Sequence, residues 1–293
     1  MVAEILYHCN GKIMEWKWST NSELLPAPFW TSCYLIDGLL IDAAAPGSED
    51  EFRTFIKRLS EEEKIEKCVI THSHEDHCGC ANMLQSEFNM PIYSSEKAIP
   101  LLKKEKNYPD YRKVTWGYPY KPVNAQKIGE KIKTVTGRYC FDIVEIPGHA
   151  EDLIALVERE QEWAFILDGV MPKYTMIFGK STDIPEDIAQ IYGSIKKIHD
   201  YTEGMDNLLI FTAGRGIFKG REFFAEKMKE IEVLHLQAHE YQKEALARGH
   251  SEKKIIKFIV KKVFGGESFI GKFTREDLSN KNLILSLLEW PLK

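Results

Sequence analysis

Apolar and polar residues alternate in short stretches over the first 215 residues, which is typical of β-strands with at least one buried face. Two pairs of these stretches are joined through Asn10-Gly11 and Asp37-Gly38, dipeptides that favour tight hairpin turns. The predicted strands are Val2–His8, Lys12–Trp18, Thr31–Ile36, Leu39–Asp42, Glu66–Ile70, Pro91–Ser94, Lys127–Thr136, Tyr139–Ile146, Leu153–Val157, Trp163–Leu167 and Leu208–Thr212.

Apolar spacing of three and four residues predicts helices between these strands and throughout the last quarter of the chain. A long charged helix begins after Lys219 and carries apolar residues from Phe223 to Ala245, and a second is marked by Ile255 to Val263. The other predicted helices are Ser48–Ser60, Ala81–Gln85, Ser95–Lys104, Ile184–Tyr201 and Leu278–Trp290. The pattern therefore predicts one α/β domain over residues 1–220 and a helical C-terminal extension over residues 221–293 that packs on it.

The segment Asn107–Pro122 is predicted to be irregular and is unusually aromatic. An irregular segment of this length inside a compact domain is more often functional than decorative. Two roles stay open: it covers a pocket, with Trp116 contacting the substrate, or it packs on a neighbouring subunit of a homo-oligomer.

Composition narrows the functional class. With 44% hydrophobic and 28% charged residues, the chain is an ordinary globular protein. No apolar run approaches the ~20 residues that span a bilayer, so no membrane association is expected. A net charge of −5 argues against a nucleic-acid partner, because phosphate binding needs clustered positive charge. The N-terminus lacks an apolar signal segment, and the six cysteines show no disulfide framework, which favours the cytoplasm.

Residues that could bind a metal ion are concentrated between a predicted strand and a predicted helix, in the segment Thr71-His72-Ser73-His74-Glu75-Asp76-His77-Cys78-Gly79. In an extended loop, residues two apart point the same way, so His72 and His74 could hold one cation. Asp76 and His77 turn towards the other side, which suits a second cation site. Imidazole and carboxylate groups suit zinc, iron or manganese. Thiolate ligation by Cys78 or Cys80 is conceivable, but buried, inert thiols are favoured.

This His-x-His-x-Asp-His motif resembles the metallo-β-lactamase superfamily, and the resemblance covers about residues 1–220. It implies a four-layer αββα sandwich and further motifs that this chain matches in order. Asp42 matches a structural strand-end aspartate, His149 in Pro147-Gly148-His149 a third histidine ligand beside His72 and His74, and Asp168 a carboxylate that bridges two metals.

The fifth motif of the family is where the chain departs from the pattern. The family has a histidine between small residues after the strand Leu208–Thr212, and here the chain reads Ala213-Gly214-Arg215-Gly216. A guanidinium group has no lone pair for a metal. Arg215 could replace the second cation by pairing with Asp168 or Asp76, leaving one metal. Alternatively, two metals bind and Arg215 contacts an anionic substrate group. Two zinc ions are favoured because Asp76, His77 and Asp168 are retained.

The resemblance implies a metal-dependent hydrolase that uses a metal-bound hydroxide on the carbonyl of an ester, thioester, lactone or related small molecule. His72, His74 and His149 would hold the first ion, and Asp76 would orient the water and accept its proton. Two other classes stay open: a non-haem iron oxidoreductase acting in oxygen or sulfur chemistry, and a non-catalytic metal-binding protein. His235 and His239 have metal-ligand spacing, but a helix-surface or pocket-lining role is favoured.

Overall fold

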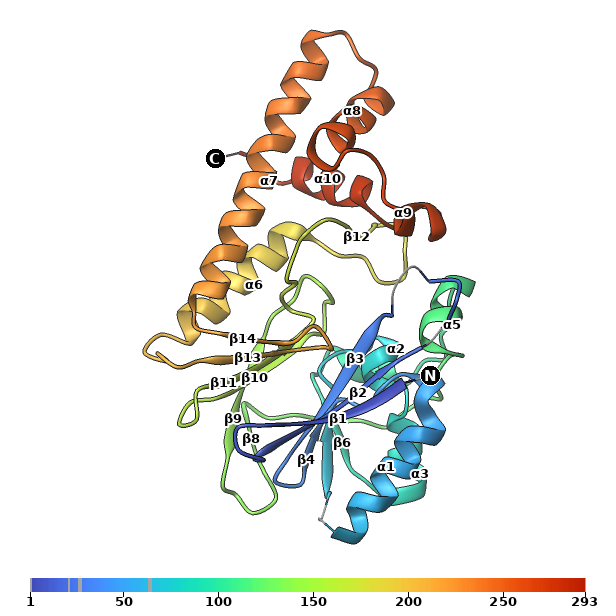
Figure 1. Ribbon diagram of the computed structural model, residues 1–293, viewed down its shortest axis with the longest axis vertical. Coiled ribbons are helices and arrows are strands. Elements are labelled where there is room, and N and C mark those ends of the chain that lie inside the picture. Colours follow the sequence, from blue (N-terminus) through green and yellow to red (C-terminus); the bar gives the residue numbers. More distant parts are fainter. Residues whose placement is uncertain (1, 21, 26–27, 63–64, 293) are drawn as a thin grey trace. The chain divides into compact units, whose positions relative to one another are not determined.

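The computed structural model describes residues 2–20, 22–25, 28–62 and 65–292, and these residues form two compact units. The first unit comprises residues 1–145, 152–168 and 207–218, and the second comprises residues 146–151, 169–206 and 219–293. The first unit carries two large sheets, and the second carries most of the C-terminal helices. Figure 1 shows the chain coloured along its sequence, with labels on elements of both units.

The strands and helices follow the predicted order closely. The strands are β1 (Val2–His8), β2 (Ile13–Ser19), β3 (Trp30–Ile36), β4 (Leu39–Ile41), β5 (Lys67–Val69), β6 (Ile92–Ser94), β7 (Gln126–Lys127), β8 (Lys131–Lys133), β9 (Cys140–Glu145), β10 (Ile154–Glu158), β11 (Trp163–Leu167), β12 (Ile177–Phe178), β13 (Leu209–Thr212), β14 (Ile217–Lys219) and β15 (Leu278–Ser279). The α-helices are α1 (Glu49–Glu62), α2 (Glu75–Cys78), α3 (Ala81–Phe88), α4 (Ala98–Leu102), α5 (Asp110–Trp116), α6 (Ile188–Tyr201), α7 (Glu222–Ala247), α8 (Glu252–Phe264), α9 (Phe269–Phe273) and α10 (Asn280–Glu289), and η1 (Pro46–Ser48) is a 3₁₀ turn.

The first sheet has the strand order β1-β2-β3-β4-β5-β6-β7, antiparallel from β1 to β4 and parallel from β4 to β7. The predicted Asp37-Gly38 turn is confirmed. Ile36 pairs with Leu39, and both turn residues have positive φ angles (46° and 75°), as a two-residue hairpin turn of type I′ requires. The second sheet has the order β14-β13-β11-β10-β9-β8.

Strand β3 shows how alternation along one strand builds two cores. Cys33 and Leu35 belong to a core that includes Phe52, Phe55 and Leu84 from α1 and α3, the helices that Figure 1 shows beside the first sheet. The intervening Tyr34 and Ile36 belong to a second core, which includes Phe141, Leu156, Phe165 and Phe211 of the second sheet. Successive side chains of a strand point to opposite faces, so β3 is buried on both sides. The first unit is therefore the predicted α/β sandwich.

Several predicted elements differ in extent from the structure. The segment Asn107–Pro122 is not wholly irregular, because it contains the helix α5. The predicted helix Ile184–Tyr201 begins only at Ile188, where the Asp187 carboxylate caps the backbone N–H groups of Ala189 and Gln190. The predicted strand Lys127–Thr136 divides into β7 and β8, and the predicted helix Leu278–Trp290 begins with the short strand β15.

In the second unit, the helices α6, α7, α8 and α10 pack against one another. His235 and His239, four residues apart on α7, both donate from Nε2 to the Trp290 carbonyl, at 2.7 and 3.0 Å. The Trp290 indole also stacks on His235, with ring centroids 4.3 Å apart. The two histidines therefore secure the end of α10 to α7, a packing role that differs from the helix-surface or pocket-lining role favoured from the sequence. Among the described residues, no helix is both long and apolar enough to cross a membrane. The division into domains at residue 220 stays a prediction.

Candidate metal centre

The candidate site in the first unit is built from residues that directly follow four strands. Asp42 follows β4, the loop 70–74 follows β5, Asp168 follows β11, and the turn 213–216 follows β13. Strands β4 and β5 are parallel neighbours, as are β11 and β13, so each pair delivers its next residues at the same sheet edge. This topology brings together side chains that are more than a hundred residues apart in the sequence.

The central loop places its histidines against one another, including His77, which the sequence predicted to turn towards the other side. The ring of His72 lies 4.5 Å from that of His74 and 4.1 Å from that of His77, measured between centroids. His72, His74 and His77 are all buried. The loop turns into the short helix α2 after His74, and this turn carries Asp76 and His77 out of the extended segment. Thr71 Oγ1 lies 3.2 Å from His72 Nδ1, which leaves Nε2 of His72 as the ring nitrogen for a cation.

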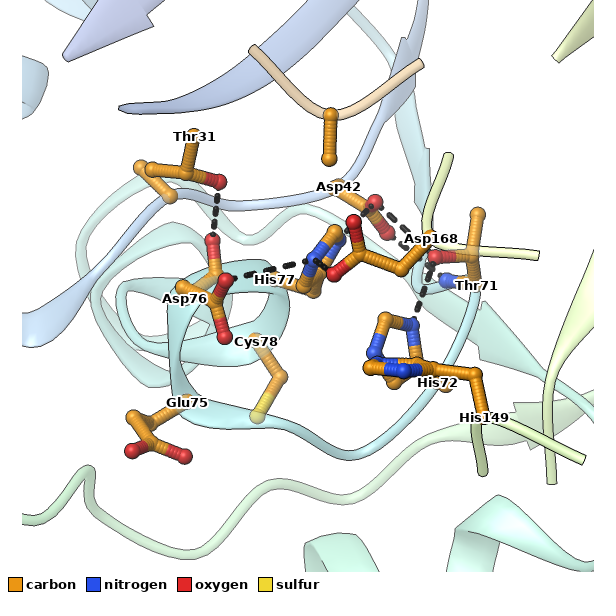
Figure 2. Close-up of polar contacts among 12 residues, drawn as sticks. Thr31, Asp42, Thr71, His72, Glu75, Asp76, His77, Cys78, His149 and Asp168 are labelled. Atoms are coloured by element: carbon orange, nitrogen blue, oxygen red, sulfur yellow. Dashed lines mark hydrogen bonds and ion pairs between the residues drawn. The ribbon is translucent and has the colours of Figure 1, made fainter. Parts of the chain in front are cut away.

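Asp42 connects the loop to the first sheet. Its carboxylate accepts hydrogen bonds from the Thr71 backbone N–H (2.7 Å) and Thr71 Oγ1 (2.9 Å), and His77 Nδ1 lies 2.6 Å away (Figure 2). The side chains of Asp42 and His77 are fully buried. A buried carboxylate is costly unless it is hydrogen-bonded, and here the bonds fix the His77 ring. Asp42 therefore has the structural role that the sequence predicts for it.

Asp168 is delivered by an irregular end of strand β11. The register with β13 shifts between Phe165 and Leu167, and Leu167 has a φ of +46°, which is rare for a branched side chain. Backbone strain of this kind persists where the surroundings enforce it, commonly at functional sites. The bulge directs Asp168 into the cluster, where its Oδ2 lies 3.1 Å from His77 Nε2.

Arg215 forms an ion pair with the same carboxylate, that of Asp168. Its Nη1 donates to Asp168 Oδ1, and the same nitrogen donates to the Ala213 carbonyl at 3.3 Å. About a third of the Arg215 side chain is exposed (32%), against 4% for Asp168. Of the two carboxylates that the sequence offered as partners for Arg215, the structure pairs it with Asp168.

The electrostatics of the cluster centre on His77. Burial lowers the pKa of the His77 imidazole, but the surrounding carboxylates, chiefly Asp76 and Asp42, outweigh burial and raise it well above its usual value. The neighbouring thiols behave differently. Burial raises the pKa of both Cys78 and Cys80, so each remains a protonated thiol, which supports the inert role favoured from the sequence.

Sequence reasoning missed the partner of Glu75, the residue between His74 and Asp76. The Glu75 carboxylate is buried and binds Arg112 of α5 through both oxygens, to Nε and Nη2. Lys106, just before α5, donates from Nζ to the Ser73 carbonyl at 3.0 Å. Arg112 of the aromatic segment and Lys106, the residue just before that segment, therefore both hold the central loop. A lone glutamate in the motif gives no sign of which distant arginine pairs with it.

Two further residues, His149 and Trp116, were predicted for the site. His149 belongs to the second unit, where it is buried and its Nδ1 lies 2.6 Å from Glu186 Oε1. Its role as a ligand beside His72 and His74 stays a prediction. Trp116 packs against the core of the first unit and contacts Phe29 edge to face, with centroids 6.5 Å apart. Its role towards the substrate also stays a prediction.

The first unit brings three potential metal ligands together. His72, His77 and Asp168 each offer one ligand atom, these atoms all lie within 4.8 Å of one another, and all three residues are buried. Nitrogen and carboxylate donors held by hydrogen-bonded neighbours such as Asp42 and Thr71 are the arrangement that zinc and similar ions require.

Comparisons with known proteins agree with this chemistry. The sequence profile of the metallo-β-lactamase superfamily matches residues 28–166, which include the central loop, Asp42 and His149. This segment belongs to the metallo-β-lactamase superfamily. The superfamily match also confirms the expected class of enzyme, a metal-dependent hydrolase.

Two curated relatives are similar over shorter parts of the chain. The hydroxyacylglutathione hydrolase GloC of Haemophilus influenzae is 28% identical over 159 residues, which are 50% of this chain and 71% of that protein. A hydroxyacylglutathione hydrolase of Bdellovibrio bacteriovorus is 26% identical over 97 residues, 33% of this chain and 31% of that protein. The second match therefore spans only about a third of its relative.

Solved metallo-β-lactamase structures share the fold at low sequence identity. The enzyme from Pontibacter korlensis is 14% identical, with a TM-score of 0.59 over 78% of this chain and 98% of that one. The FIM-1 enzyme from Pseudomonas aeruginosa, described in a mono-zinc form, is 14% identical, with a TM-score of 0.58 over 78% of this chain and 95% of that one. These similarities confirm the predicted αββα fold.

Proposed function

We propose that this chain is a metal-dependent thioesterase that hydrolyses small acyl thioesters. The metal-dependent part is carried by His72 and His74 of the central loop, two buried imidazoles whose ring centroids lie 4.5 Å apart inside the segment that matches the superfamily profile. The thioester class is supported by the two relatives, both named as hydroxyacylglutathione hydrolases. The substrate is thus a small molecule, in line with the sequence-based expectation.

We assign the catalytic zinc ion to His72, His74 and His149. Zinc prefers imidazole and carboxylate ligands in a site that keeps one position open for water or substrate. Thr71 is the hydrogen-bonding partner of His72 at Nδ1, and Glu186 is the partner of His149 at Nδ1. These contacts leave Nε2 of each histidine as the ligand atom. Iron or manganese could bind the same donors, and elemental analysis of the purified protein distinguishes the three metals.

When bound, the ion supplies Lewis acidity, which makes water a stronger nucleophile at neutral pH and polarises the thioester carbonyl. Asp76 accepts the proton of the attacking water at its carboxylate. Its backbone carbonyl is fixed by Thr31 Oγ1 at 2.8 Å, which holds the residue at the start of α2. A C–O bond forms at the acyl carbon and the C–S bond breaks. The thiolate, whose conjugate acid has a pKa of about 8.5, leaves readily and then takes the proton from Asp76.

The cysteines support a reducing compartment such as the cytoplasm for this activity. All six are free thiols in the structure, and four of them (Cys33, Cys68, Cys78 and Cys80) are buried. Structural disulfides are common in secreted proteins of oxidising compartments and rare in the cytosol.

The test is a substrate panel on zinc-loaded protein: a hydroxyacyl thioester of glutathione, the matching oxyester and a β-lactam. We expect kcat/KM for the thioester to exceed that for the oxyester at least about tenfold, since thiolates leave more readily than alkoxides. His74→Ala should lower thioester hydrolysis by about a hundredfold or more together with its metal content.

The matched control is His199→Ala, a substitution on α6 of a histidine that contacts Asp200 and is about a quarter exposed (26%). This variant should keep its metal and its activity. If the oxyester or the β-lactam is the better substrate, the thioesterase assignment is wrong. If His74→Ala retains its metal content, the ligand assignment is wrong.

A further inference from the structure

The part of the cluster around Asp168 already contains a positive charge. Arg215 Nη1 donates to one oxygen of Asp168, while His77 Nε2 lies 3.1 Å from the other oxygen. Both carboxylate oxygens of Asp168 thus have a protein nitrogen in contact. A metal ion bound to Asp168 at this place would have to displace one of these nitrogens or lie beside a permanent cation.

The Arg215 side chain is held in place by the backbone of its own turn. Gly214 has a φ of +70°, and a Cβ atom there would lie 2.6 Å from the Trp30 backbone, so the turn requires glycine at this position. Thr212 Oγ1 donates to the Gly216 carbonyl at 2.7 Å and closes the turn. Arg215 Nη1 also donates to the Ala213 carbonyl within the turn. The turn therefore holds the guanidinium group of Arg215 against Asp168.

Both ring nitrogens of His77 also contact protein carboxylates. Its Nδ1 lies 2.6 Å from Asp42 Oδ2, and its Nε2 lies between Asp168 and Asp76, with Asp76 Oδ2 at 3.4 Å. Three carboxylates surround this ring, and the Arg215 guanidinium supplies positive charge that a second metal ion would otherwise supply. Figure 2 shows Asp42, His77 and Asp168 joined in this network.

We propose that Arg215 is a built-in cation that takes the place of a second metal ion, so that the chain binds one ion and not the two favoured from the sequence. The inference deepens the proposed function and rests on its metal site, but not on its substrate. Arg215 is on this account a positioning residue, which holds the carboxylate of Asp168 and, through it, the ring of His77.

The experiment measures metal ions per chain in the full-length protein after zinc loading and desalting, by elemental analysis and native mass spectrometry. We expect one ion in the wild type and two in Arg215→His, where a neutral imidazole replaces the cation. Arg215→Lys keeps the positive charge and should bind one ion. The matched control Arg138→His, at an exposed arginine of the first unit, should also bind one ion.

Two ions in the wild type would overturn the inference, and so would two ions in Arg215→Lys or a single ion in folded Arg215→His. Circular dichroism checks the folding of each variant. If Arg215→His does not fold, Arg215→Asn provides a neutral oxygen donor in its place, with the same expected gain. No bound ion in the wild type would contradict the proposed metal site itself. That result differs from two bound ions, which would contradict only the role of Arg215.

Discussion

At the scale of single residues, the chain order of the motifs could be read from the sequence, but their hydrogen-bond partners could not. His72, His74, Asp76 and His77 lie within six positions, so one loop must bring them together. The pairing of Arg215 was left open between two carboxylates and a substrate, because only the fold decides that Asp168 lies within reach. Bulges such as the one before Asp168 depend on the neighbouring strand and leave no local pattern.

Asp42 gives a residue-scale prediction about stability. Replacing Asp42 with alanine removes the carboxylate that accepts hydrogen bonds from Thr71 and His77. Their buried donor groups then lose this hydrogen-bond acceptor. We expect Asp42→Ala to lower the free energy of unfolding by about 2–4 kcal/mol, since each unsatisfied buried donor costs about 1–3 kcal/mol. Urea unfolding of the metal-free protein measures this without a contribution from the ion. The exposed Asp206→Ala is the control and should change stability by less than about 0.5 kcal/mol. Equal stability of the two variants would contradict the role given to Asp42.

At the scale of elements, strands and long helices were predictable because their apolar residues repeat with a clear period. The short helix α5 was not, because its seven residues follow Pro109 and include aromatic and β-branched side chains with low helix propensity. Tertiary contacts stabilise this helix instead. Arg112 is buried against Glu75, and the guanidinium lies 5.7 Å from the centre of the Tyr108 ring. A buried ion pair of this kind links α5 to the metal-binding loop.

The ion pair between α5 and the loop can be tested by a double-mutant cycle. Arg112→Met leaves the Glu75 carboxylate buried without its partner and should cost about 3–5 kcal/mol of unfolding free energy. Adding Glu75→Gln removes the charge and should recover a large part of that loss, giving a coupling energy that additive effects cannot explain. The control is Lys113→Met, on the next residue of α5, whose partner Asp110 is almost fully exposed (97%). Additive effects of the two substitutions would show that Arg112 does not hold the loop through Glu75.

At the scale of the whole molecule, the fold class and the superfamily were predictable because strand order, turn chemistry and motif spacing agree over about two hundred residues. The organisation of the C-terminal helices was only partly predictable. Their amphipathic pattern places α7 and α8, but the His235 and His239 contacts to Trp290 join residues more than fifty positions apart. The substrate class depends on the surface around the site, for which the sequence offers only the similarity to the two relatives.

Metal dependence can be measured as thioester hydrolysis at different amounts of bound metal. Treating the full-length protein with a chelator, followed by desalting, should abolish hydrolysis of the hydroxyacyl thioester. Adding back zinc should restore it in proportion to the ion bound, and the melting temperature should rise, since saturation at about 1,000 times Kd stabilises a folded protein by about 4 kcal/mol. Undiminished hydrolysis by protein without detectable metal would contradict the account.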